Sequence, residues 1–261
     1  MTIGARVYGL AAIALGVPGL IYGGFAAMGQ PVPPQIWGYH MLAWASAGLL
    51  ILAGVAVDIP RIAAAGSLAL ASFFALCLLA LHLPNAFAQP LVWVSWESVA
   101  ENTVMVLGGV LAFTLAPGVG ESRAAAVARI ARPLFGLSLM VFGTSEFVYA
   151  GFTASLVPAW LPPSPLFWTW LTGAAQIAAG LAIVTGVRAR LAAILLTAMY
   201  LVFGLIVHLP RVIADPSGAG VWGENGVNLV LAGAAWLLAD SLAAAKPRSG
   251  QSAADSELPA S

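Results

Sequence analysis

The chain has 261 residues, of which 61% are hydrophobic and only 8% are charged. Soluble proteins carry about 25% charged residues, so this composition excludes a soluble globular protein and indicates an integral membrane protein that contacts the lipid bilayer. Ten basic and ten acidic residues give a net charge of zero, which does not indicate a nucleic-acid partner.

Apolar runs of about 20 residues, the length that crosses a bilayer as a helix, recur along the chain. We predict an all-α, polytopic membrane protein with eight transmembrane helices, near residues 7–28, 36–57, 62–83, 98–116, 133–152, 166–187, 190–209 and 224–243. Every basic residue except Arg211 falls in the connections on one side of this arrangement. The positive-inside rule therefore predicts a multi-pass protein of the cell membrane, taken here as a bacterial inner membrane, with both termini cytoplasmic.

Residues 6–116 and 132–241 read as two copies of one four-helix unit. Three short matches occur in the same order in both copies: Tyr22 and Tyr149 near the end of the first helix, His82-Leu83-Pro84 and His208-Leu209-Pro210 at the end of the third, and Glu101-Asn102 and Glu224-Asn225 at the start of the fourth. An even number of spans in each unit makes the repeats parallel. We therefore divide the chain into a first unit (1–117), a cytoplasmic linker (118–131), a second unit (132–245) and a disordered tail (246–261).

Two familiar kinds of chemistry are missing from the sequence. Cys77 is the sole cysteine, so an internal dithiol pair is excluded. The sequence contains no nucleotide-binding loop, Ser-His-Asp order or HExxH motif, which argues against ATP-driven transport and the commonest intramembrane hydrolases. No catalytic residue and no cofactor can be assigned from such motifs.

Glu146 is the only formal charge between Leu134 and Phe152, inside the predicted fifth helix. A lipid-exposed charge at that depth costs about 2.5–3.5 kcal/mol, and no Lys or Arg lies in the interior of any predicted span to pair with it. We therefore expect Glu146 to point into the second unit, near Gln176 or His208, in a small outward-facing polar pocket roofed by a tryptophan. The candidate pocket residues are Glu146, Gln176, His208, Tyr149, Trp168, Trp222, Glu224 and Asn225. The alternative is that Glu146 reaches the outer headgroups.

Other polar residues near the outer ends of the helices permit more than one interpretation. His82 and His208 either interact with helix C-terminal dipoles, relay protons or contact substrate, or form a pair of haem or metal ligands. Glu101 and Glu224 fit the first turn of a helix, where the dipole favours acids. The outer tryptophans form either an interfacial aromatic belt or a lid over a cavity.

The second unit resembles the DoxX-like family of four-helix membrane proteins. The similar stretches are Phe142–Phe147, Leu161–Trp168, Gly173–Leu181 and Asn228–Ala234. Many relatives have a His where Glu146 stands and a Glu where Gln176 stands, so this chain differs at both polar positions. The resemblance implies four helices for each unit, a membrane location and an association with quinone-coupled or oxidative-stress systems.

Three functions remain open. The leading hypothesis is a non-catalytic accessory subunit of a redox or respiratory assembly, with other membrane redox subunits as partners. The second is binding or transport of a small lipophilic molecule, such as a quinone or a lipid, that enters between the repeats. The third is a haem-containing redox protein that uses His82 and His208.

Overall fold

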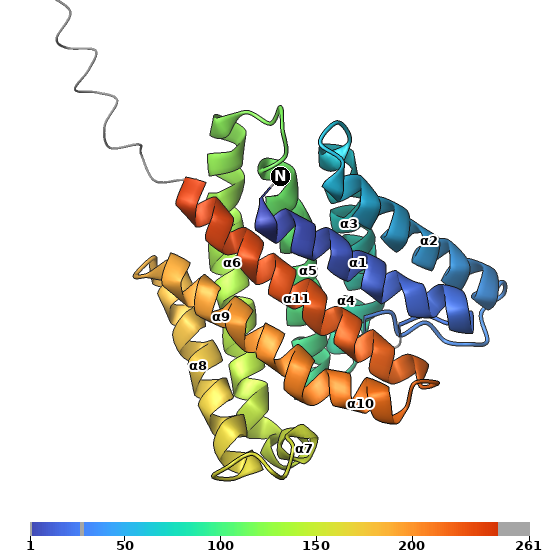
Figure 1. The fold of residues 1–261 in the computed structure, drawn as a ribbon, viewed down its shortest axis with the longest axis vertical. Helices are drawn as coiled ribbons and strands as arrows, with labels where there is room; N and C mark the ends of the chain where they lie inside the picture. The colour runs from blue at the N-terminus through green and yellow to red at the C-terminus, as the bar shows by residue number, and fades with distance from the viewer. Residues whose placement is uncertain (1, 27–28, 245–261) are drawn as a thin grey trace, which may run out of the picture.

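A computed structural model describes residues 2–26 and 29–244, and every regular element in these ranges is a helix (Figure 1). The all-α prediction is therefore confirmed. The tail predicted for residues 246–261 lies outside the described residues.

The first unit contains α1 (Ile3–Tyr22), α2 (Tyr39–Asp58), α3 (Ala63–Cys77), the π-helical turn η1 (Leu78–His82), α4 (Leu83–Ala88) and α5 (Trp93–Thr114). The second contains α6 (Glu121–Val148), α7 (Ala150–Leu156), α8 (Pro165–Thr185), α9 (Ala189–Phe203), the π-helical turn η2 (Gly204–His208), α10 (Leu209–Ala214) and α11 (Ala219–Ala244). Each π turn ends at the histidine of a His-Leu-Pro segment. Because proline lacks an N–H group and clashes with the carbonyl of residue i−4, a wide turn ahead of it lets the helix continue.

Seven helices in the described residues are long and apolar enough to cross a membrane, when α3–α4 and α9–α10 are each taken as one. This confirms a multi-pass architecture. The predicted span at residues 98–116 corresponds to α5, which has 22 residues but is not among the seven. The count of eight crossings is therefore not confirmed.

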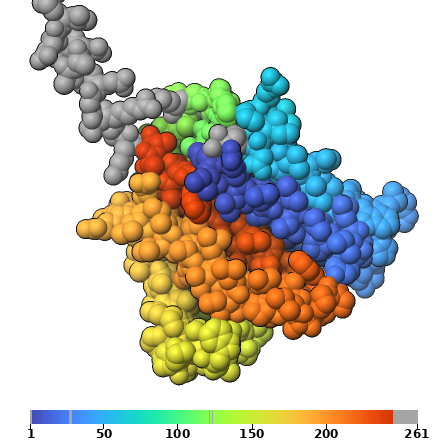
Figure 2. Space-filling model, in the orientation of Figure 1, coloured from blue at the N-terminus to red at the C-terminus, as the bar shows by residue number. Residues whose placement is uncertain are grey.

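The helices pack so that the first helix of each unit lies against the last helix of the other. In the first unit α1 contacts α2 and α11, while in the second unit α6 contacts α8 and α5 (Figure 1). Figure 2 shows α11 between α1 on one side and α9–α10 on the other. Accordingly, α11 is the most enclosed of the seven candidate spans, with 67% of its 18-residue apolar window buried.

Close glycine contacts join the first two helices in each unit. A Cβ added at Gly54 would lie 2.6 Å from the carbonyl oxygen of Gly9, and one added at Gly180 would lie 2.5 Å from that of Gly136. Only glycine permits this approach of two backbones, as at other small-residue helix crossings in membranes. The α1–α2 and α6–α8 pairs thus use the same packing at corresponding places.

Two predicted boundaries differ from the observed helices. The first helix ends at Tyr22 rather than near residue 28, because Gly23 adopts a left-handed conformation with φ of 64° and stops it. The fifth begins at Glu121, so much of the polar segment that we predicted as a linker is the start of α6. At its other end α6 stops at Val148 and α7 follows after Tyr149.

Candidate functional site

A cavity of about 450 Å³ lies within the second unit and is bordered on one side by α5 of the first. We call it the polar cavity. Five residues that the sequence predicted for the pocket line it: Glu146, Gln176, His208, Tyr149 and Glu224. The other polar residues along its wall are Glu97, Ser98, Glu101, Ser145, Thr153, Tyr200, Arg211 and Asn228. Residues from eight helical elements, η2 included, therefore meet at one place.

Three predicted pocket residues do not line this cavity, namely Trp168, Trp222 and Asn225. The indole Nε1 of Trp168 donates to the carbonyl of Pro162 at 2.8 Å, and that of Trp222 donates to the carbonyl of Pro216 at 3.0 Å. Each tryptophan therefore joins the first turns of its helix to the preceding loop by a hydrogen bond. The structure places aromatic residues of α6, α7 and α9 in the cavity wall instead, including Phe142, Phe152 and Phe203.

Glu146 lies beside α8 because the two helices approach closely at that level. A Cβ added at Gly173 would lie 2.8 Å from the Cβ of Glu146, and one added at Gly143 would lie 2.5 Å from the carbonyl oxygen of Gly173. Gln176 follows Gly173 by three residues, slightly less than a full turn, and is buried. The glycines thus bring the two polar side chains of α6 and α8 to the same cavity.

Hydrogen bonds hold the neighbouring helices around the cavity. The indole of Trp93 on α5 donates to the hydroxyl of Ser145 on α6 at 2.8 Å, and the backbone N–H of Val94 donates to the Tyr149 hydroxyl at 3.1 Å. Elsewhere in the wall, the Asn228 amide of α11 donates to the Tyr200 carbonyl of α9 at 2.9 Å. Hydrogen bonds therefore join the helices that line the cavity in two parts of its wall.

Five polar atoms of the cavity residues are buried without a hydrogen-bond partner. They are Oε1 of Glu101, Oε2 of Glu146, Oε1 of Gln176, the hydroxyl of Tyr200 and Nδ1 of His208. Each such atom costs about 1–3 kcal/mol when nothing satisfies it, and native proteins rarely leave several together. Their convergence on one cavity indicates a place where polar groups of a bound molecule or water are held.

The charges of the cavity are unevenly distributed. Arg211 forms an ion pair with Glu224, the only ion pair among the described residues. Glu97, Glu101 and Glu146 therefore line the cavity without a basic partner. No group of three or more metal-ligating side chains occurs within residues 2–26 and 29–244, so these carboxylates do not form a recognisable metal centre there.

The two matched histidines have different surroundings. His82 is buried, and its Nε2 donates to the carbonyl of Gly29 at 3.0 Å. In this unit Gln30 is also buried, and it accepts a hydrogen bond from Ser46 at 3.5 Å. His208 instead faces the open polar cavity. The nitrogen of His82 that a metal most often takes is therefore already occupied.

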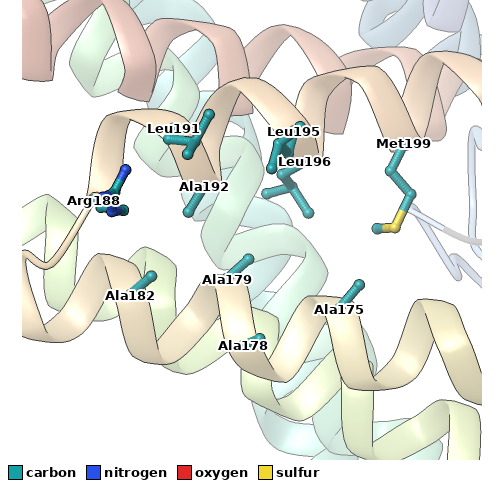
Figure 3. A pocket seen from close by; sticks show the side chains of 10 residues that line it. All are labelled: Ala175, Ala178, Ala179, Ala182, Arg188, Leu191, Ala192, Leu195, Leu196 and Met199. Carbon is teal, nitrogen blue, oxygen red and sulfur yellow. The ribbon is translucent and has the colours of Figure 1, made fainter.

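A second cavity of about 350 Å³ lies between α8 and α9, and we call it the alanine groove. Figure 3 shows alanines of α8 facing longer side chains of α9, with Arg188 at one end. Its lining residues are Ala175, Ala178, Ala179, Ala182, Arg188, Leu191, Ala192, Leu195, Leu196 and Met199. The small alanine side chains leave the space that larger residues would fill.

Sequence reasoning overlooked several cavity residues, above all Glu97, Glu101 and Tyr200. Glu101 was assigned to a helix start, because the helix was predicted to begin near residue 98, but α5 begins at Trp93. Glu97 and Glu101 are four residues apart and so share one helical face. Two acids at this spacing in a largely apolar helix are the feature of the sequence that could have identified both as site residues.

The DoxX family model matches residues 127–209, which run from α6 to the first residue of α10. This range includes Glu146, Gln176 and His208, and it confirms the resemblance that the second unit showed. No curated protein and no solved structure matches the chain.

Proposed function

We propose that this multi-pass membrane protein, whose residues 127–209 match the DoxX family, binds a small lipophilic molecule in the polar cavity. The observation that supports this function is the convergence of five unpartnered buried polar atoms on one cavity. A bound molecule with a polar group would satisfy several of them at once.

The size and lining of the cavity suit a small organic molecule. Its volume of about 450 Å³ falls in the range of roughly 300–1,000 Å³ that is usual for such sites. Phenylalanine, valine and leucine side chains line the wall together with the polar groups. Apolar surface with a few convergent polar groups is the usual composition of a ligand site.

The alanine groove supplies a route from the bilayer. Ala175 and Met199 line the groove, while their neighbours Gln176 and Tyr200 line the polar cavity. The two spaces therefore lie beside the same turns of α8 and α9, on neighbouring faces of these helices. A lipophilic molecule that first occupies the groove needs only a local separation of these helices to reach the cavity.

We further propose that α5 completes eight crossings and that both termini are cytoplasmic. The basic residues in the connections support this orientation. In this arrangement the polar cavity lies in the outer half of the bundle. The accessory-subunit hypothesis rests on the family resemblance alone, and the haem hypothesis rests on the matched histidines alone. Both stay predictions.

Equilibrium dialysis of decylubiquinone, a neutral lipophilic probe, against the purified protein in nanodiscs tests the proposal. Thr153 of α7 lines the cavity and is half-buried, so Thr153→Trp should fill the space, while Thr153→Val keeps the volume of the side chain. We expect saturable binding that Thr153→Trp weakens by about tenfold or more and Thr153→Val preserves. Unchanged binding in Thr153→Trp would place the probe elsewhere.

A further inference from the structure

Acidic side chains outnumber basic ones in the polar cavity. Its wall carries four glutamates, Glu97, Glu101, Glu146 and Glu224, and one arginine, Arg211. Arg211 is paired with Glu224. The remaining three carboxyl groups face the cavity with no basic side chain of the described residues as an ion-pair partner, so a positively charged group would complement them.

The unpartnered atoms are mostly hydrogen-bond acceptors. The amide oxygen of Gln176 accepts only, as do ionised carboxylate oxygens of Glu101 and Glu146. Gln176 and Tyr200 are only 3% and 4% exposed, so neither can turn to bulk water. A positively charged molecule complements this set of acceptors, and one that also brings N–H or O–H donors can form hydrogen bonds with it.

Aromatic rings lie in the same wall. Phe142, Tyr149, Phe152 and Phe203 all line the cavity. The faces of aromatic rings attract cations, and rings combined with carboxylates recognise alkylammonium groups. Apolar, aromatic and acidic surfaces are thus combined in one space.

From these features we infer that the polar cavity binds a lipophilic organic cation, such as a substituted ammonium, with Glu146 and Glu101 as its counter-charges. The inference rests on the proposed function and specifies the class of ligand. The positive charge faces the two carboxylates, and its apolar substituents lie against the phenylalanines.

Tetraphenylphosphonium is a suitable cationic probe, used with the full chain in nanodiscs. Equilibrium dialysis should show one saturable site. Glu146→Gln and Glu101→Gln each keep the shape of the side chain and remove its charge, so each should weaken binding by about tenfold or more. Asp58→Asn is the matched control, because Asp58 ends α2 in the first unit, away from the cavity. It should leave the affinity unchanged.

Decylubiquinone separates the possible outcomes. If the neutral probe binds in the cavity and tetraphenylphosphonium does not, the cation inference is wrong and the proposed function stands. If neither probe binds, the proposed function fails as well. Tetraphenylphosphonium binding that survives in both Gln variants also overturns the inference. The comparison of the two probes on the unmodified protein gives a result even if a variant does not fold.

Discussion

At the scale of single residues, Gly108 of α5 is the tightest contact in the centre of the bundle. A Cβ added there would clash with the ring of the fully buried Tyr8 and lie 2.9 Å from the Cβ of Ala234. Tyr8 cannot move freely, because its hydroxyl donates to the carbonyl of Met105 at 2.6 Å. We expect Gly108→Ala to lower the free energy of unfolding by about 1–3 kcal/mol, measured by reversible unfolding in mixed micelles.

Gly48 of α2 is the control for this substitution. A Cβ added at Gly48 meets nothing within 4 Å, so Gly48→Ala adds a methyl group in open space. Alanine in a helix is favoured over glycine by about 0.5–1 kcal/mol, so this variant should be as stable as the unmodified protein or more stable. Equal losses in both variants would show that close packing at Gly108 is not the cause.

All of the polar site residues predicted from the sequence that line the cavity belong to the second unit, and none of the cavity residues in the first unit was predicted. Glu146 is predicted as a site residue because a charge inside an apolar run needs a partner. Its depth in the helix predicts that Gln176 or His208 lies nearby. Glu101 reaches the cavity only because α5 of the first unit packs on α6 of the second. Periodicity within one helix does not specify which distant helix will cover it.

At the scale of helix pairs, α9 and α11 are joined by a hydrogen bond from the side chain of Asn228. The Asn228 amide crosses to the Tyr200 carbonyl, whereas the Asn102 amide donates to the Ser98 carbonyl of its own helix at 3.2 Å. Both side chains are buried, so Asn→Ala removes the same volume at each site. We expect Asn228→Ala to cost about 0.5–1.5 kcal/mol more stability than Asn102→Ala.

The measurement is the difference in unfolding free energy between the two variants under identical detergent conditions. If Asn102→Ala is the more damaging substitution, the inter-helix bond of Asn228 contributes less than the loss of packing at Asn102.

The alanine groove gives a second prediction for a helix pair. Ala178 lies on α8, is exposed and lines the groove, so Ala178→Phe should occupy part of it without reaching the polar cavity. We expect association of decylubiquinone to slow by about tenfold while its equilibrium affinity stays constant, because the contacts in the cavity are unaltered. Stopped-flow fluorescence quenching would measure the rate.

Leu181→Phe is the matched control for the groove. Leu181 also lies on α8 and is exposed, but it does not line the groove. Equal rates for both variants would mean that the probe does not enter between α8 and α9.

The hydrophobicity of the sequence predicts which segments form membrane helices, but the residue at which each helix begins or ends depends on local geometry. The predicted first span ran on to residue 28 because its composition stays apolar, whereas a left-handed glycine at position 23 stops α1. The polar start of α6 was predicted as a linker because a segment outside the bilayer carries no hydrophobic signal. Such a segment can still be helical, and here it is continuous with the span.

At the scale of the whole molecule, several matched features support duplication. The π turns at Leu78–His82 and Gly204–His208 are 126 residues apart, as are the Trp96–Pro90 and Trp222–Pro216 hydrogen bonds. The Glu-Asn match of the sequence has a spacing of 123, almost one helical turn out of register with these features. We therefore predict that the two units superpose with Asn102 opposite Asn228, by rotation about an axis near the membrane normal. A best superposition about an axis in the membrane plane would contradict it.

The number of crossings depends on α5, whose 22 residues span about 33 Å at 1.5 Å per residue. That length suffices for a hydrocarbon core of about 30 Å. Its polar residues lower its hydropathy, but α3, α6 and α11 contact it, so much of its surface is shielded from lipid. A helix covered by other helices can cross the membrane with polar side chains that face a protein interior.

Reporter fusions decide whether α5 crosses. We expect fusions after Arg123 and at the C-terminus to read cytoplasmic, and fusions after Gln89 and Pro216 to read external, because the basic connections remain inside. Gln89 precedes α5 and Arg123 follows it, so this pair of fusions brackets the helix. If both read on the same side, α5 does not cross and the chain has an odd number of spans. If all four readings are exchanged, α5 crosses but the orientation is reversed, and the polar cavity then lies in the cytoplasmic half of the bundle.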